Sequence, residues 1–138
     1  MVHPEQDRRL VALVVDDEPL IRQLIRSILR RHGWRTIDAA SGEEALAISA
    51  AQPDLLITDH NLPAMSGLEL AQAIRRQAPD VPVLVMSGGD GVGRLAANLG
   101  YQFIRKPFDF EDFLAAVVTT WNANRMGREV RSSGQGTN

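Results

Sequence analysis

The strongest constraint on the fold is a fivefold alternation of short strand-like runs with segments of helical periodicity. The first, third and fourth runs are largely apolar, which is typical of strands buried on both faces, and the second alternates like a half-exposed strand. The runs lie at residues 10–15, 34–40, 55–59, 81–86 and 101–105. Helical patterns follow at about 19–32, 43–51, 68–77, 94–99 and 109–121. This order predicts right-handed βαβ units around a parallel sheet, an α/β fold.

The helical segments carry start and stop signals. Pro19 suits a first helical turn, and Gly33 ends the apolar periodicity that follows it. In the last segment, begun by Asp109 or Asp112, the spacing predicts an inward face made of Phe110, Phe113, Leu114, Val117 and Val118.

Bulk properties limit the class of protein. The 138 residues, 44% of them hydrophobic, fit one domain with a real core, which we place at residues 10–124 after an N-terminal arm, 1–9. Residues 125–138 are mostly polar without periodicity and are expected to be a disordered tail. A net charge of −2 argues against nucleic-acid binding. No run is long enough to cross a membrane, no signal peptide is evident and no cysteine is present, so we expect a cytoplasmic protein.

Polar side chains follow four of the predicted strands. These are the pair Asp16 and Asp17, then Asp59, Ser87 and Lys106. Functional groups of open parallel sheets collect where the carboxyl ends of the strands meet. Three carboxylates there would raise one another's pKa unless a cation lay among them, and hard oxygen ligands on a half-open surface favour Mg²⁺. A plain salt-bridge cluster of Asp16, Asp17 and Lys106 is the structural alternative.

The loops argue against a nucleotide-binding site. A dinucleotide-binding domain places glycines after its first strand to hold a pyrophosphate, whereas this chain has Asp16, Asp17 and Glu18 there. The glycine-rich stretch at residues 88–93 lacks the Gly-Lys-Ser/Thr ending of a P-loop. We therefore interpret it as a mobile loop.

Together these motifs resemble the receiver domains of two-component response regulators, in particular the stand-alone, chemotaxis-regulator-like ones. The resemblance covers about residues 10–121 and rests on the Asp16-Asp17 pair, on Asp59 with Pro63 and Gly67 downstream, on Ser87, and on Lys106-Pro107-Phe108. It implies a doubly wound, flavodoxin-like fold in which helices flank a five-stranded parallel sheet of order 2-1-3-4-5.

The resemblance also implies a phosphorylation switch. Asp59 would be the phosphoacceptor, and a histidine kinase or a histidine phosphotransfer protein would be the donor. Mg²⁺, for which Mn²⁺ can substitute, would be held by Asp17, Asp59 and the main-chain carbonyl of Asn61, with Asp16 acting through water. Phosphoryl transfer needs mainly positioning and charge neutralisation, which a metal ion and a lysine supply.

Three further residues would bind or transmit the phosphoryl group. By the same resemblance, Lys106 would pair with one phosphate oxygen and Ser87 would donate to another. Phe103 lies where the family carries its switch aromatic, although its alternation with Ile104 also suits a core position. Such a protein is no enzyme with a separate substrate. It would be a monomer or weak homodimer that binds an unidentified downstream protein.

Several alternatives remain open at this stage. The chain could be a receiver segment of a hybrid histidine kinase or a degenerate interaction module. It could also be a Mg²⁺-dependent phosphohydrolase with a transient aspartyl phosphate, although that would need an acid where Asn61 stands. His60 is either a solvated loop residue or one that tunes access to Asp59. The arginines at 22, 26 and 30 form a solvated face or a docking stripe for an acidic partner.

Overall fold

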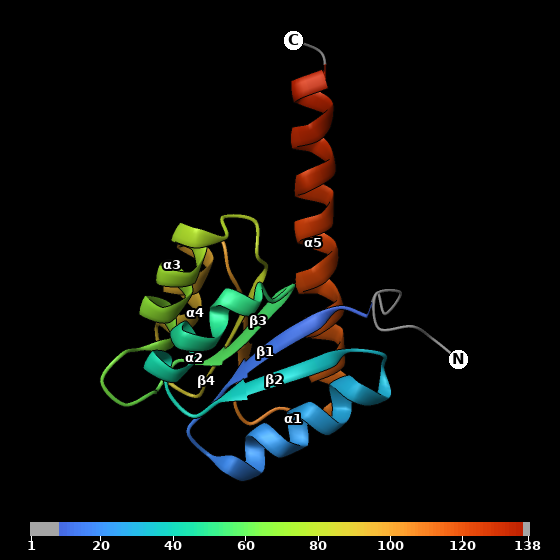
Figure 1. Ribbon diagram of the computed structural model, residues 1–138. Helices are drawn as coiled ribbons and strands as arrows, with labels where there is room; N and C mark the ends of the chain where they lie inside the picture. Colours follow the sequence, from blue (N-terminus) through green and yellow to red (C-terminus); the bar gives the residue numbers. More distant parts are fainter. Residues whose placement is uncertain (1–8, 137–138) are drawn as a thin grey trace.

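The computed structural model describes residues 9–136, with side chains placed for residues 9–123. Five parallel strands form one sheet of order β2-β1-β3-β4-β5 (Figure 1), which confirms the predicted topology. The strands are β1 (Val11–Val15), β2 (Arg35–Ala39), β3 (Leu55–Asp59), β4 (Val83–Ser87) and β5 (Gln102–Arg105). The helices are α1 (Pro19–Arg31), α2 (Gly42–Ile48) with the short 3₁₀ turn η2 (Ser49–Ala51), α3 (Gly67–Gln77), α4 (Val92–Asn98) and α5 (Phe110–Gly136).

The core consists of two apolar layers, one on each face of the sheet. Alternate strand residues point to opposite faces, so Ala12 and Val14 of β1 enter one layer while Leu13 and Val15 enter the other. The first layer is completed by α1 and α5, and the second by α2, α3 and α4. Cover on both faces explains why the three inner strands, β1, β3 and β4, are largely apolar, whereas the edge strands β2 and β5 are only partly buried and carry polar residues.

The helix ends agree with the local sequence signals. Ser66 and Glu69 form a reciprocal capping box at the start of α3, which satisfies two backbone N–H groups that have no partner within the helix. Gly33 follows α1 with a φ of +90°, a conformation that glycine adopts without a steric penalty. Asp109 accepts a hydrogen bond of 2.7 Å from the Asp112 backbone, so it caps α5.

The inward face predicted for α5 is wrong at two positions. Phe113 and Val117 are buried, but Phe110 is 47% exposed and Val118 is 55% exposed. Val118 lies about 100° around the helix from Val117, outside the stripe that faces the sheet. Phe110 belongs to the first turn and contacts the His32 ring instead of the core. The apolar stripe is therefore narrower than the sequence pattern predicts.

Helix α5 extends into the stretch that the sequence predicts to be a disordered tail, residues 125–138, of which the last two lie outside the described residues. Helix α5 continues to Gly136 and projects beyond the sheet (Figure 1). Once the first turns have formed against the sheet, each further residue adds a hydrogen bond at a smaller entropic cost than nucleation, and Met126, Arg128 and Glu129 are good helix formers. The predicted arm lies outside the described residues except for Arg9. Within the described part of the chain, no helix has the length and hydropathy needed to span a bilayer.

Candidate functional site

Strand polarity brings the predicted site residues to one edge of the sheet. Asp16 directly follows β1, Asp59 and Ser87 are the last residues of β3 and β4, and Lys106 directly follows β5. In the registers, Val15 lies beside Thr58 and Asp59 beside Met86. All four positions are thus at the carboxyl edge, as predicted.

Lys106 joins the two buried carboxylates of this edge. Its Nζ lies 3.1 Å from Asp16 Oδ2 and 3.3 Å from Asp59 Oδ2. Asp16 is fully buried and Asp59 is 5% exposed. One ammonium between two carboxylates leaves a net negative charge. The carboxylates that pair with Lys106 are Asp16 and Asp59, whereas the predicted salt-bridge alternative had Asp16 and Asp17.

Burial and charge shift the titration of both partners in this cluster. Burial raises the pKa of Asp59, and the Asp16 charge raises it further. The Lys106 ammonium and a hydrogen bond with the Asn61 backbone lower it without cancelling the rise. For Lys106, burial lowers the pKa, but the hydrogen bonds and charges of the two carboxylates outweigh burial, and the pKa is raised. The lysine therefore stays protonated across the physiological range.

The loop after β1 offers a set of oxygen donors. Asp16, Asp17 and Glu18 each have a carboxylate oxygen within 4.8 Å of the others, and the latter two side chains are exposed. Carboxylate oxygens on a partly open surface suit Mg²⁺, and a cation here would offset the net charge around Asp59. The donor set therefore fits the predicted ion. Glu18 was absent from the predicted ligands, although its position two residues after Asp16 was a usable signal.

The loop after β3 folds back tightly on Asp59. The Gly67 N–H donates to the His60 carbonyl at 2.9 Å, and a Cβ at this position would overlap the Asp59 carbonyl oxygen. Asn61, two residues after Asp59, is exposed. His60 is half-buried, and its Nδ1 is buried without a hydrogen-bond partner among the described residues. It is therefore not a simple solvated loop residue.

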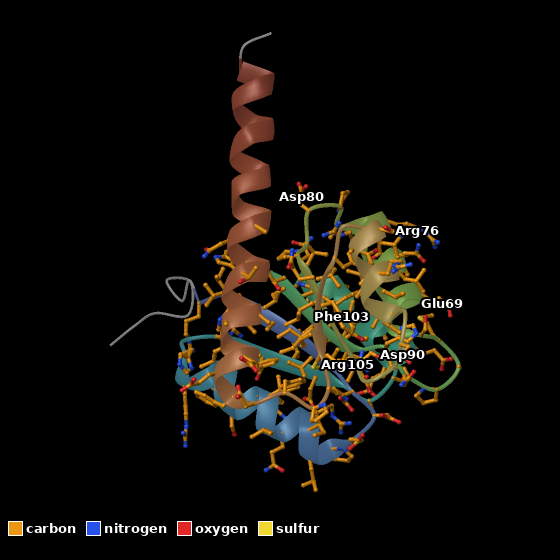
Figure 2. The ribbon with its side chains drawn as sticks, turned by 180° about the vertical axis from the view of Figure 1, so that it is seen from behind. Glu69, Arg76, Asp80, Asp90, Phe103 and Arg105 are labelled. Carbon is orange, nitrogen blue, oxygen red and sulfur yellow. The ribbon has the colours of Figure 1, made fainter. Side chains whose placement is uncertain are left out.

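Ser87 ends β4 at this edge, and Phe103 lies within β5. Ser87 is fully buried, and its Oγ accepts a hydrogen bond of 2.9 Å from the Gly89 N–H, which leaves the hydroxyl proton available for another acceptor. The half-buried Phe103 ring packs on the core next to Gly93 of α4. In the rear view, Phe103 and Arg105 mark β5 (Figure 2). Arg105 Nη2 pairs at 3.2 Å with Oδ1 of Asp90, in the loop between β4 and α4.

Comparison with known proteins assigns this arrangement to a family. The family model of the response regulator receiver domain matches residues 12–118. The chain belongs to this family. The receiver assignment and the flavodoxin-like fold predicted from the sequence are thereby confirmed, whereas the metal, phosphate and switch roles of individual residues stay predictions.

Two curated relatives and one solved structure define the similarity. This receiver is 36% identical over 107 residues to the probable transcriptional regulatory protein TcrX of Mycobacterium tuberculosis, covering 75% of the chain and 46% of TcrX. It is 36% identical over 125 residues to the nitrogen assimilation regulatory protein NtrX of Azorhizobium caulinodans, covering 86% of the chain and 28% of NtrX. The structure of the chemotaxis protein CheY4 of Vibrio cholerae superimposes with a TM-score of 0.74 at 30% identity, covering 81% of this chain and 98% of that one. The chain thus spans less than half the length of these two curated relatives.

Proposed function

We propose that this receiver is a phosphorylation-dependent switch whose phosphoacceptor is Asp59. The donor is the phosphohistidine of a histidine kinase or histidine phosphotransfer protein, and the reaction needs Mg²⁺. The observation that carries the proposal is the contact of Lys106 with both Asp16 and Asp59 at the carboxyl edge of a receiver fold. A carboxylate prepared for a phosphoryl group needs a fixed cation beside it, because charge neutralisation is most of what this chemistry requires.

In the proposed reaction, an Asp59 carboxylate oxygen forms a bond to phosphorus while the phosphorus–nitrogen bond of the donor breaks. The electron pair of that bond leaves with the imidazole of the donor. Lys106 holds Asp59 in place beforehand and can donate to a phosphate oxygen once the phosphoryl group has arrived. Asp17, Asp59 and the Asn61 carbonyl would hold Mg²⁺, with Asp16 acting through water. The bound ion supplies charge neutralisation for the phosphate oxygens.

The output of the switch is proposed to run through Ser87. An aspartyl phosphate adds negative charge and acceptor oxygens. The Ser87 hydroxyl oxygen accepts a hydrogen bond from the Gly89 N–H, and its proton remains available for donation. It can therefore donate to a phosphate oxygen while the hydrogen bond from Gly89 stays in place. Movement of this loop toward Asp59 would change the surface around α4 and Phe103, to which a downstream protein binds.

The decisive experiment is incubation with acetyl phosphate and Mg²⁺, followed by intact-mass measurement of the wild type and of Asp59→Asn. A phosphoryl adduct on the wild type alone, lost when Mg²⁺ is chelated, is the expected result. No adduct with any small donor, together with no Mg²⁺ binding, would overturn the proposal in favour of a degenerate interaction module.

The extent of the natural protein is a separate matter. Because the chain covers only 46% of TcrX and 28% of NtrX, a stand-alone regulator and a receiver segment of a larger regulator or hybrid kinase are both compatible with the proposed chemistry. We propose the stand-alone form, which the genomic reading frame tests directly. The predictions that the chain binds no nucleic acid, acts in the cytoplasm and turns over no separate substrate go with that proposal. Release of more than one phosphate per chain from an added phosphomonoester would instead indicate the phosphohydrolase.

A further inference from the structure

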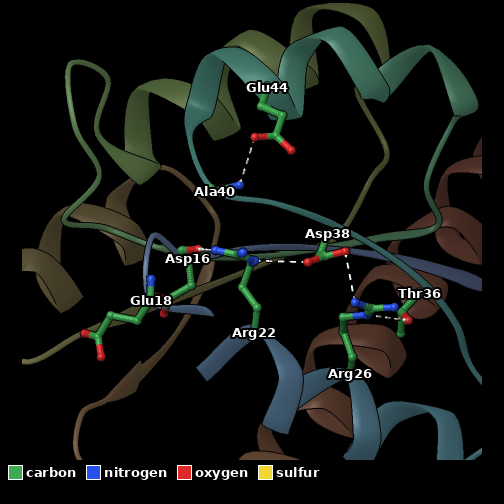
Figure 3. A network of polar contacts seen from close by, with 8 residues as sticks. All are labelled: Asp16, Glu18, Arg22, Arg26, Thr36, Asp38, Ala40 and Glu44. Carbon is green, nitrogen blue, oxygen red and sulfur yellow. Dashed lines mark hydrogen bonds and ion pairs between the residues drawn. The ribbon is translucent and has the colours of Figure 1, made fainter. Parts of the chain in front are cut away.

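Arg22 of α1 links the acidic loop to the edge strand β2. Its Nη1 donates to the main-chain carbonyl of Asp16 at 2.7 Å, and its Nε donates to Asp38 Oδ2 at 3.0 Å (Figure 3). The Arg22 side chain is only 18% exposed. The interpretation of the arginine stripe as a solvated face therefore fails for this residue.

The other two arginines of the stripe do not take part in this link. Arg26 Nη1 pairs with the second oxygen of Asp38 at 3.2 Å, and Arg30 Nε donates to Thr36 Oγ1 at 3.1 Å (Figure 3 shows Arg26, Asp38 and Thr36). Both residues tie α1 to β2. Within the described residues, Arg22 is the arginine of the stripe that donates to Asp16.

Every hydrogen-bonding group of Asp16 is engaged. Its N–H donates to the Ala39 carbonyl at 3.2 Å, Oδ1 accepts from the Glu18 N–H at 2.9 Å, Oδ2 contacts Lys106, and the carbonyl accepts from Arg22. The peptide units on both sides of residue 17 are thus held, one through the Asp16 carbonyl and the other through the Glu18 N–H. The exposed carboxylate of Asp17 projects from a fixed backbone.

We propose that Arg22 is a positioning residue that sets the affinity of the acidic loop for a divalent cation. By holding the Asp16 carbonyl it keeps Asp17 in place for the ion. This inference rests on the metal site of the proposed function. A bare guanidinium so near would repel a cation, but its ion pair with Asp38, which Arg26 shares, offsets part of that charge. Partners that orient metal ligands in this way typically change metal affinity by about 10- to 100-fold when removed.

Charge and positioning predict opposite results when Arg22 is replaced. If only its charge acted, Arg22→Met would bind cations more tightly and Arg22→Lys would not differ from the wild type. Positioning predicts that both variants bind Mn²⁺ about tenfold more weakly, because the lysine ammonium lacks the planar fork that spans the carbonyl and Asp38. Arg26→Met is the matched control, because it removes an equal charge from the same helix and also removes a partner of Asp38. Its Mn²⁺ affinity should stay within about twofold of that of the wild type.

Electron paramagnetic resonance of free Mn²⁺ measures the Mn²⁺ affinity of each variant. Circular dichroism verifies that each variant is folded. Hydrogen exchange of the Glu18 amide gives a metal-free readout and should accelerate in the two Arg22 variants but not in Arg26→Met. If the wild type binds Mn²⁺ while Arg22→Lys binds equally well or more tightly, or if Glu18 exchange is unchanged, the inference is wrong and the proposed function stands. If the wild type itself binds no Mn²⁺, the proposed function is overturned. Should Arg22→Met not fold, Arg22→Lys and Arg22→Gln decide.

Discussion

Lys106 and Asp16, 90 residues apart in the sequence, are joined by a contact of 3.1 Å between Nζ and Oδ2. The contact connects the loop after the last strand to the loop after the first. Because the same ammonium also contacts Asp59, it links three loops that the sheet order brings to one edge. Its removal should therefore affect both the stability and the charge of the site.

Replacement of Lys106 by Met should lower the free energy of unfolding at pH 7 by about 3 kcal/mol, because two buried carboxylates lose their shared partner. The loss should shrink at acidic pH, where the carboxylates are protonated. Urea unfolding at pH 7 and pH 4 with EDTA present measures both values. A uniform loss at both pH values would show that packing of the lysine stem, and not its charge, is what matters.

Asp59→Asn should stabilise the metal-free protein at neutral pH. Since burial raises the pKa of Asp59 in the folded state, the stability associated with its protonated form is complete below the unfolded-state pKa and is lost as pH rises through the folded-state pKa. The gain in unfolding free energy of the variant over the wild type should thus be absent below the unfolded-state pKa. It should grow as pH rises to the folded-state pKa and then level off. Urea titrations in EDTA at several pH values test the sign, and Asp90→Asn, on an exposed loop, is the control that should show no such pattern.

Gly67→Ala should cost about 2 to 3 kcal/mol of unfolding free energy, because the new Cβ overlaps main-chain atoms of Asp59 and His60 that no side-chain rotation can move. Gly88→Ala is the matched control: its Cβ would meet the Lys106 carbonyl oxygen at 3.5 Å, an ordinary contact. Thermal unfolding of both variants makes the comparison. Equal losses of stability in the two variants would contradict the close packing of Gly67 against the main chain of Asp59.

Phe113→Ala in α5 should cost about 3 to 5 kcal/mol, whereas Val118→Ala should change the unfolding free energy by no more than about 0.5 kcal/mol. Phe113 is fully buried and stacks on Phe108 with ring centroids 5.4 Å apart, while Val118 is exposed. Chemical denaturation of the two variants measures both changes and tests whether the buried stripe of α5 includes Phe113 but not Val118. A large loss at Val118 would mean that another surface covers it in solution.

Much of the site was determined by the sequence itself. Strand-length apolar runs and helical periods predicted a parallel sheet, and the common polarity of parallel strands then required Asp16, Asp59, Ser87 and Lys106 to share an edge. The stop at Gly33 likewise depends on local backbone geometry. These features are local, or follow from the order of elements, so periodicity and spacing are enough to predict them.

Other features depended on the tertiary structure. The exposure of Phe110 and Val118 depends on how wide a stripe of α5 the sheet covers, and periodicity does not encode that width. The contacts of Arg22 with Asp16 and Asp38 join three elements, and the spacing of the arginines left its role open because it carries no information about the strand opposite. The raised pKa of Asp59 comes from burial and from the Asp16 charge, which together outweigh the lowering by the Lys106 ammonium. Contacts between segments distant in the sequence, and the solvent they exclude, decide such properties.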